Sequence, residues 1–165
     1  MNEIFERTSI RQYSDTQVSD EDVRKVLQAG MAAPSACNAQ PWRFLVLRDK
    51  DNLEKYAGVS PYAHFLKDAS FGVVVFGDRN MSKEAYILQD CSAACENMLL
   101  EAVTLGFGGC WLGICPEKPR MAAVRELSGV PENLMPICIL SFGYPKTAHK
   151  PMDKFDTDKI YYEHY

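Results

Sequence analysis

The sequence lacks the short motifs that usually mark a nucleotide-binding loop or a hydrolytic centre. It contains no GxxxxGK[ST] phosphate-binding loop, and the glycines between positions 106 and 113 do not fit the GxGxxG dinucleotide pattern. It also contains no HExxH, no GxSxG and no local cysteine–histidine pair. Only three histidines are present, so no nucleophile relay can be assembled from the sequence. We name no catalytic residue and expect any chemistry to belong to a bound cofactor.

Long apolar runs and an excess of positive charge are missing as well. No stretch approaches the roughly 20 apolar residues that cross a membrane, and the net charge is −4 with a pI of about 5.4. This charge gives no reason to expect nucleic acid or an anionic membrane as a partner. The first ten residues, MNEIFERTSI, carry acidic side chains and no apolar core of a secretory signal. We therefore expect a cytoplasmic protein.

Ligand spacings typical of a metal site are absent. The cysteines form no CxxC pair and the histidines are scattered, so we predict no metal centre. A buried free cysteine packs as a small apolar residue. We interpret all six cysteines as core thiols in a reducing compartment: Cys37, Cys91, Cys95, Cys110, Cys115 and Cys138.

The pattern of apolar residues predicts one α+β domain over residues 1–165, with a sheet sandwiched by helices. A chain of 165 residues is long enough to bury a core without disulfides or a structural metal. Apolar residues at helical spacing predict a helix that Ser19 caps and Pro34 ends. Other helices are predicted near 2–7, 50–57, after Pro61, 84–106 and 117–127, and strands at 42–47, 71–76, 108–113 and 136–142.

The C-terminal segment, residues 144–165, fits no regular pattern. It ends in an aromatic stretch, Ile160 to Tyr165, and is too aromatic to be a free disordered end. It also has neither helical nor long strand periodicity. Either it lies along its own domain or it wraps a second subunit, and periodicity alone does not choose between the two.

A polar cluster near the N-terminus is the first of three that suit a cofactor. Arg7, Thr8, Ser9 and Arg11 place two guanidinium groups and two hydroxyls within five residues. Guanidinium forms planar bidentate hydrogen bonds with phosphate, and hydroxyls fill the remaining phosphate oxygens. The alternative is a solvated helix end that binds no ligand.

The second and third clusters follow the Ser19 helix and the longest helix. Ser35, Asn38 and Gln40 stand on a loop between two prolines, where they could read the edge of a flat heteroaromatic ring. Alternatively, they satisfy only the backbone of their own turn. The segment Trp111–Leu112–Gly113 ends a short strand, where a glycine lets a ligand approach the backbone closely. Its alternative role is a tight strand end packed under the long helix.

In this order, the three clusters resemble the FMN-dependent nitroreductase family. That family opens with an RxSxR element before a helix ending in APSxxNxQPW, and residues 7–47, RTSIRQYSDTQVSDEDVRKVLQAGMAAPSACNAQPWRFLVL, contain both. The stretch LQDCSAACENMLLEAVTLGFGGCWLGICPE looks like the family's central dimer helix and glycine-rich strand. PENLMPICILSFGYP resembles its last core strand and GYP turn. The resemblance covers nearly the whole chain and is weakest between about 50 and 84.

The resemblance implies a nitroreductase-like fold with a central mixed sheet, an extended C-terminal tail and a homodimer with two FMN sites built from both subunits. In such enzymes NADH or NADPH reduces FMN and leaves before an acceptor such as a nitroaromatic or a quinone binds, a ping-pong sequence. Alternatives are other chemistry on the same fold, such as dehalogenation or dehydrogenation, and a flavin-binding electron carrier without NAD(P)H turnover. Acceptor choice would depend on residues after Gly58 that could line the mouth: Tyr62, His64, Phe65 and Lys67, unless His64 and Lys67 are merely exposed.

The resemblance also implies which residues bind FMN. Arg7 and Ser9 match residues that hold the phosphate and ribityl chain, and Arg11 matches a basic residue near the flavin N1 and O2 edge. Reduction places negative charge at N1, which a fixed cation stabilises. The loop at 34–40 matches a segment donated by the neighbouring subunit, and 111–113 matches a strand end on the flavin N5 side. The predicted cofactor-binding residues are Arg7, Thr8, Ser9, Arg11, Pro34, Ser35, Ala36, Asn38, Gln40, Trp111, Leu112, Gly113, Lys150 and Lys154.

One position departs from the family pattern. Many relatives have KPR in the tail, where this chain has Lys150–Pro151–Met152. Lys150 and Lys154 lie where the family has a second basic pair near the phosphate. Methionine cannot bind phosphate, so either these lysines supply the charge or the affinity for FMN is reduced.

Overall fold

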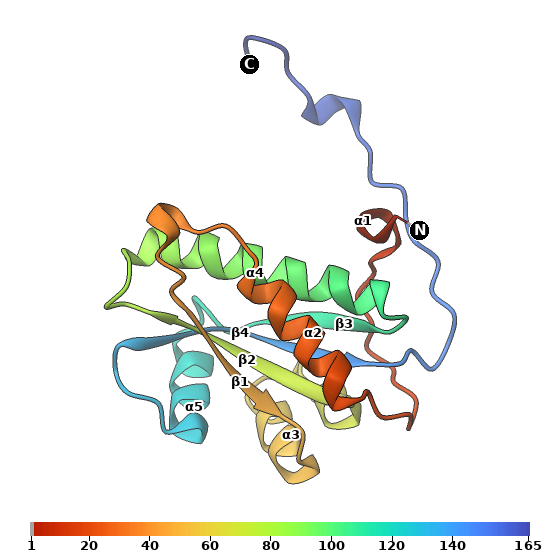
Figure 1. Ribbon diagram of the computed structural model, residues 1–165, viewed down its shortest axis with the longest axis vertical. Coiled ribbons are helices and arrows are strands. Elements are labelled where there is room, and N and C mark those ends of the chain that lie inside the picture. Colours follow the sequence, from red (N-terminus) through yellow and green to blue (C-terminus); the bar gives the residue numbers. More distant parts are fainter. Residues whose placement is uncertain (1) are drawn as a thin grey trace.

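The computed structural model describes residues 2–165 and shows a four-stranded sheet between layers of helices (Figure 1). The strands are β1 (Trp42–Leu47), β2 (Phe71–Asp78), β3 (Gly108–Gly113) and β4 (Leu134–Gly143), in the order β1-β2-β4-β3. The α+β class is therefore confirmed. All three pairs of neighbouring strands are antiparallel, which differs from the expected mixed sheet. Within residues 2–165, parallel pairing occurs only as an isolated bridge between Ser9 and Gly109.

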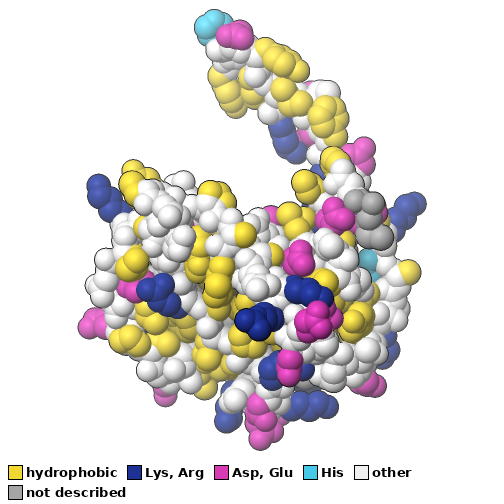
Figure 2. All heavy atoms as spheres, in the orientation of Figure 1, with side chains coloured by type: hydrophobic (Ala, Val, Ile, Leu, Met, Phe, Trp, Pro, Cys, Tyr) yellow, Lys and Arg dark blue, Asp and Glu magenta, His cyan; other side chains and the backbone are white. Residues whose placement is uncertain are grey.

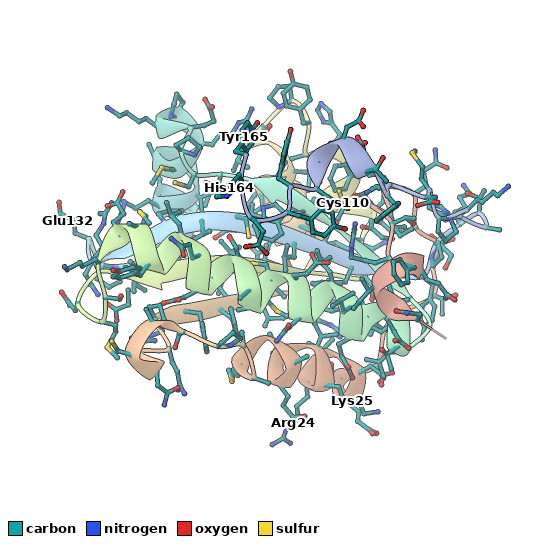
Figure 3. All side chains as sticks on the ribbon, turned by 90° about the horizontal axis from the view of Figure 1, so that it is seen from above. Arg24, Lys25, Cys110, Glu132, His164 and Tyr165 are labelled. Atoms are coloured by element: carbon teal, nitrogen blue, oxygen red, sulfur yellow. The ribbon has the colours of Figure 1, made fainter. Side chains whose placement is uncertain are left out.

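Helices cover both faces of the sheet. On one face α2 (Asp20–Met31) packs beside α4 (Glu84–Thr104), which runs along the length of the sheet (Figure 3). On the other face lie α3 (Lys50–Ala57) and α5 (Lys118–Ser128). No helix within residues 2–165 is long and apolar enough to span a bilayer. The short elements are α1 (Glu3–Glu6) and the 3-10 turns η1 (Ala36–Asn38), η2 (His64–Asp68) and η3 (Thr157–Lys159).

The central strand β2 is buried on both faces, as its unbroken apolar run predicts. Val73 and Val75 pack into the core shared with α2 and α4, whereas Val74 and Phe76 pack into the core shared with α3 and α5. Successive side chains of a strand point to opposite faces. A strand buried on both faces therefore shows no alternation of polar and apolar residues in its sequence.

Local sequence signals set the ends of the helices. The Ser19 hydroxyl accepts a hydrogen bond from the Asp22 N–H (3.1 Å) and caps α2, as predicted. Gly106, with a φ of 85°, follows α4 in the left-handed conformation that commonly stops a helix. The helix predicted after Pro61 is only the 3-10 turn η2. The other predicted helices and strands are present, and their ends differ from the predicted ones by at most two residues.

A β-bulge in β4 provides a hydrogen-bond acceptor for the residues that follow β3. The register shifts at Pro136, so Ile137 has no partner on β2. Proline has no N–H to donate to the ladder. The Ile137 carbonyl instead accepts hydrogen bonds from the N–H groups of Ile114 (3.2 Å) and Cys115 (3.0 Å).

Most cysteines are core thiols, as interpreted. Cys91, Cys95, Cys110 and Cys138 are buried, and burial raises the pKa of Cys91 to about 12. The interpretation is wrong for Cys37, which is exposed because its loop lies outside the core, and Cys115 is only half-buried. Among residues 2–165, no three His, Cys, Asp or Glu side chains are grouped to hold a metal ion.

Most of the C-terminal tail is exposed, although residues 150–155 face the N-terminal segment of the same chain across a cavity. From Lys146 to Tyr165 every residue except Asp156 is exposed, and the segment arches clear of the body (Figures 1 and 2). Met152 is 75% exposed and Tyr162 is 83% exposed. The arrangement of the tail with respect to a second subunit therefore stays a prediction.

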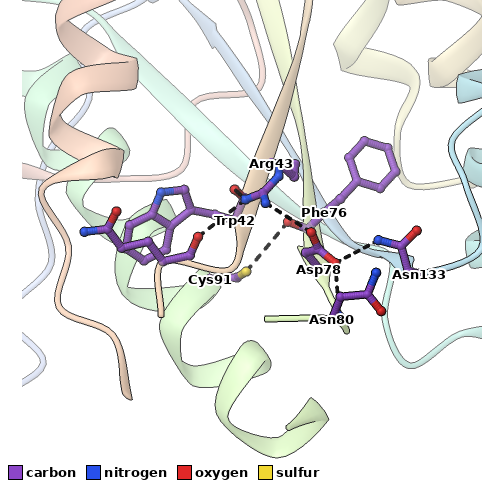
Figure 4. Close-up of polar contacts among 8 residues, drawn as sticks. Trp42, Arg43, Phe76, Asp78, Asn80, Cys91 and Asn133 are labelled. Carbon is purple, nitrogen blue, oxygen red and sulfur yellow. Dashed lines mark hydrogen bonds and ion pairs between the residues drawn. The ribbon is translucent and has the colours of Figure 1, made fainter. Parts of the chain in front are cut away.

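A buried carboxylate ties three strands together at one end of the sheet (Figure 4). Asp78 is 8% exposed and accepts hydrogen bonds from Arg43 on β1 (3.0 Å), from the Asn133 amide before β4 (2.8 Å) and from the Asn80 N–H (3.0 Å). Burial acts to raise the pKa of Asp78, but Asn133, the Asn80 N–H and Arg43 outweigh it and hold the pKa below its ordinary value. The carboxylate is therefore charged at neutral pH.

We expect Asp78→Asn to destabilise the protein by about 1–3 kcal/mol at neutral pH, because hydrogen bonds to a charged group are lost. The folded-state pKa is depressed, so this stabilisation is present above the unfolded pKa of about 3.9 and is lost as the pH falls through the folded value. Urea unfolding of wild type and variant from neutral pH down to about pH 3 measures it. Exposed Asp51→Asn is the matched control. A loss that does not shrink with falling pH would contradict the charged role.

Candidate functional site

A cavity of about 910 Å³ lies between α1 and the C-terminal tail. The N-terminal cluster and the tail lysines, more than 100 residues apart, line it together. One wall is apolar and includes Phe5, Met152 and Phe155. Four cations and two hydroxyls around one space suit an anionic group of a ligand whose other parts are apolar. The polar lining residues are Arg7, Thr8, Ser9, Arg11, Lys150 and Lys154, with Asp153 beside them.

Arg7 is oriented by an acid on α4. Its Nε lies 3.2 Å from Oε1 of Glu96, and its side chain is 21% exposed. Because Glu96 occupies Nε, the two Nη groups remain for a bidentate contact with a ligand. Sequence reasoning missed Glu96, since nothing in its distance along the chain from Arg7 signals the contact.

The N-terminal segment is anchored to the edge of the sheet. Ser9 bridges Gly109, and the Ile10 N–H donates to the Gly109 carbonyl (2.9 Å). This brings Arg11 and Ser9 to Cys110 on β3, the strand residue labelled in Figure 3. Burial raises the pKa of the Cys110 thiol, and the Arg11 charge and the Ser9 hydroxyl oppose that rise. The first cluster therefore lies beside the strand that carries the third.

The third cluster stands on an open strand edge. β3 is an edge strand, and its Gly109 carbonyl points outward to Ile10. Alternation along the strand turns the backbone groups of Trp111 and Gly113 to the same outer side. There the Gly113 carbonyl accepts a hydrogen bond from Nη1 of Arg120 on α5 (3.1 Å), a residue that sequence reasoning missed. A ligand at this edge would meet backbone N–H groups.

The loop of the second cluster has a strained backbone. Cys37, Asn38 and Gln40 have φ values of 52°, 52° and 49°, a region that residues other than glycine rarely occupy. The Gln40 N–H donates to the Ser35 hydroxyl (3.0 Å), and the Gln40 side-chain amide donates to Oδ1 of Asn38 (3.0 Å). Such strain persists where surrounding structure enforces it, and it is typical of functional loops.

Asp90 on α4 holds this loop in place. Its Oδ1 accepts a hydrogen bond from the Ala36 N–H (3.0 Å), and the residue is 6% exposed. Its Oδ2 is the only buried side-chain oxygen or nitrogen within residues 2–165 that has no hydrogen-bond partner. A buried carboxylate oxygen without a donor costs free energy. The contact with Ala36 is therefore made despite an unfavourable environment for the carboxylate.

The structure brings together two of the three clusters. The N-terminal cluster and β3 adjoin each other, and Arg7 reaches the C-terminal half of α4 through Glu96. The loop over 34–40 lies instead near the beginning of α4, at Asp90 (Figure 1). None of its residues lines the 910 Å³ cavity. Within one chain the predicted site is therefore incomplete.

Two of the four residues expected at the mouth contact arginines of the site. The Phe65 ring centroid lies 5.9 Å from Cζ of Arg11, and the Tyr62 centroid lies 5.7 Å from Cζ of Arg120. His64 is exposed, which agrees with the alternative that it only faces solvent. Lys67 is exposed and lines a different cavity, which it shares with Arg11.

The cations of the cavity and the adjoining edge of β3 are groups that suit an anionic ligand. A family model described as the Nitroreductase family matches residues 4–60 and 57–144. A relative from Archaeoglobus fulgidus, provisionally named as an NADH dehydrogenase/NAD(P)H nitroreductase, is 47% identical over 165 residues, covering 97% of this chain and 95% of the relative.

Solved structures agree in fold over the full length. An FMN-dependent nitroreductase from Clostridium difficile has a TM-score of 0.93 at 28% identity and covers 99% of both chains. A provisionally assigned nitroreductase from Desulfovibrio desulfuricans, solved in complex with FMN, has a TM-score of 0.85 at 34% identity, covering 99% of this chain and 95% of that one. The chain belongs to the nitroreductase family. This confirms the resemblance carried by its RxSxR and APSxxNxQPW elements, and the assignment to flavin-dependent oxidoreductases.

We expect Asp90→Ala to destabilise the protein by about 1–3 kcal/mol, because the Ala36 N–H loses its buried acceptor. Asp90→Asn should cost less, since its amide oxygen can keep that bond. Urea denaturation of both variants beside wild type measures the difference. An equal loss in the two variants would contradict the role given to the hydrogen bond between Asp90 and the Ala36 N–H.

Proposed function

We propose that this protein is an FMN-dependent NAD(P)H oxidoreductase that reduces nitroaromatics, quinones or related acceptors by hydride transfer. The observation that carries the proposal is the meeting of the N-terminal cluster with Lys150 and Lys154 at one cavity beside the open edge of β3. The cations suit the phosphate of FMN, and the strand edge offers backbone N–H groups to its ring. The names of similar proteins include FMN and NAD(P)H.

The phosphate end of FMN would lie between the N-terminal segment and the tail. Arg7 would contribute a bidentate fork, and the hydroxyls of Thr8 and Ser9 would donate to the remaining oxygens. Lys150 and Lys154 would add point charges. Met152 lines the same cavity, so the departure from KPR falls on a residue that faces the ligand. We infer that the two lysines flanking it replace the missing arginine.

The ring would lie with Arg11 along its N1 and O2 edge and with the strand end 111–113 along its N5 edge. Phe65 beneath Arg11 and the Arg120 contact with Gly113 hold these two walls in position. Bound FMN would take a hydride from NADH or NADPH and pass it to an acceptor. Because the hydride moves between stacked rings, the chain has to orient the rings and needs no side-chain acid or base.

A second copy of the chain would complete each site. The loop with Pro34, Ser35, Ala36, Asn38 and Gln40 does not reach its own cavity, and a two-fold dimer would place it at the cavity of the partner. The tail supports this arrangement, because large apolar side chains on an arm are unfavourable in water unless a partner covers them. They are Met152, Phe155, Ile160, Tyr161, Tyr162 and Tyr165.

The absorbance spectrum of the purified protein and its steady-state kinetics test the proposed function. We expect a yellow protein with one FMN per chain that oxidises NADH or NADPH with menadione or nitrofurazone as acceptor. Alternation of donor and acceptor at one site predicts ping-pong kinetics. Bound FMN without NAD(P)H oxidation would indicate an electron carrier instead. A monomer that retains FMN in ultracentrifugation at low micromolar concentration would overturn the shared site.

Arg7 and Arg11 should have separable effects on the cofactor. Arg7→Ala should weaken FMN binding by about 1.5–3 kcal/mol, the scale of a hydrogen bond to a charged group, without moving the midpoint potential of bound FMN. Arg11→Ala should lower that potential, because a cation beside N1 favours the negative charge of reduction. Fluorescence titration and spectroelectrochemistry measure the two effects.

Arg24→Ala, on the outer side of α2 (Figure 3), is the control for this pair. Met152→Arg in the tail is a further test variant. Arg24→Ala should change neither quantity, and Met152→Arg should tighten FMN binding if position 152 faces the phosphate. An unchanged potential in Arg11→Ala with FMN still bound would refute the role given to Arg11.

A further inference from the structure

A second cavity, of about 510 Å³, opens on the other side of Arg11. Its walls come from the chain after Arg11, the first turn of α3, η2 and the turn that follows β4. Unlike the first cavity, it has no apolar wall of large side chains. Its charged lining residues are Arg11, Lys50, Lys67, Lys146, Asp15 and Asp68.

Positive charge predominates in this cavity and is not neutralised by ion pairs. Four of the six charged groups are cations, and none of the six makes an ion pair within 4.0 Å with any residue between 2 and 165. Cations gathered around a hollow raise the local concentration of anions. Because the lysines come from three separate segments, folding alone brings them together. This grouping around one cavity differs from the scattered lysines of an ordinary solvent-exposed surface.

The walls of the cavity are held by backbone contacts. The Lys146 N–H donates to the Gln12 carbonyl (3.0 Å), and the Ser14 N–H donates to the Tyr144 carbonyl (2.9 Å). Lys67 belongs to η2, the same short turn that places Phe65 beneath Arg11. The positions of these lysine backbones relative to Arg11 are therefore fixed by the fold.

Arg11 lines both cavities, so a ligand in the second cavity lies directly beside the cofactor site. The phosphate of FMN already has its own cations in the first cavity. An additional anion that must come close to the flavin is the nicotinamide dinucleotide donor. Both coenzymes carry a pyrophosphate, and NADPH carries a further phosphate on its adenosine ribose.

We propose that the second cavity binds the phosphate groups of the nicotinamide donor while the nicotinamide enters the cofactor site past Arg11. The proposal rests on the proposed function. Lys50, Lys67 and Lys146 supply charge to the phosphates. Asp15 and Asp68 provide acceptors for ribose hydroxyls, the contact that carboxylates make in other dinucleotide sites.

The test uses the FMN-loaded protein and its Lys50→Ala, Lys67→Ala and Lys146→Ala variants. Calorimetry with adenosine 2′,5′-bisphosphate, adenosine 5′-diphosphate and adenosine measures phosphate binding without turnover. Rapid-mixing reduction by NADPH and by NADH gives the Kd of each donor. Lys55→Ala is the matched control, because Lys55 is exposed on α3 but does not line the cavity.

We expect each of the three variants to weaken donor binding about threefold to tenfold, with the effect shrinking at high salt. Their FMN content and their limiting rate of reduction should not change, nor should any quantity in Lys55→Ala. A loss for NADPH and adenosine 2′,5′-bisphosphate alone would assign the cavity to the 2′-phosphate. A loss for both donors and for adenosine 5′-diphosphate would assign it to the pyrophosphate.

Equal donor affinities in wild type and all three variants would overturn the proposal, as would an equal loss in Lys55→Ala. Adenosine binding as tightly as its phosphorylated forms would also overturn it. Failure of the proposed function would look different, because wild type would then lack FMN or would not oxidise either donor.

Discussion

The attachment of the N-terminal segment to the edge of β3 is the contact on which the candidate site depends. Ile10 and Tyr13 are 4% and 6% exposed, and the Tyr13 hydroxyl donates to the Ile10 carbonyl (2.7 Å) and lies 2.7 Å from Ser141 Oγ. Burial raises the pKa of Tyr13, so its hydroxyl stays protonated. With these two side chains buried, Ser9 and Arg11 remain exposed beside the strand. A segment without regular structure thus presents its polar side chains in fixed places.

The same attachment gathers cations that repel one another. Glu96 offsets part of the charge of Arg7, but Arg11, Lys150 and Lys154 have no carboxylate within ion-pair distance among residues 2–165. An anionic ligand relieves this repulsion, and a ligand that binds only the folded state stabilises it. Cofactor binding at the proposed site would therefore stabilise the fold. Arg11 lines both this cavity and the second one.

Hydrophobic periodicity was sufficient to predict the helices and strands, because burial on one or two faces leaves a period in the sequence. It did not predict strand direction, since an antiparallel and a parallel buried strand have the same apolar run. The expectation of a mixed sheet came from the family resemblance alone, and the three strand pairs of this chain are antiparallel. Periodicity also did not distinguish the exposed Cys37 from the buried cysteines, because a loop carries no period. Glu96 and Asp90 were missed because their contacts join segments far apart in the chain. Arg120 lies only seven residues from Gly113, but its contact depends on how α5 packs against the end of β3, which no residue period reports.

By itself the sequence determined the elements of this protein, its family and the residue types suited to a phosphate and a flat ring. These depend on local patterns and on side-chain chemistry. Only the tertiary structure decided that the N-terminal arginines meet the tail lysines at one cavity, while the loop over 34–40 stays at the far end of α4. It also decided that Arg11 faces two cavities. The place of Arg11 follows from the attachment of the N-terminal segment to β3, and the place of the loop follows from its contact with Asp90 on α4. Contacts between distant segments leave no signal in the spacing of residues along the chain.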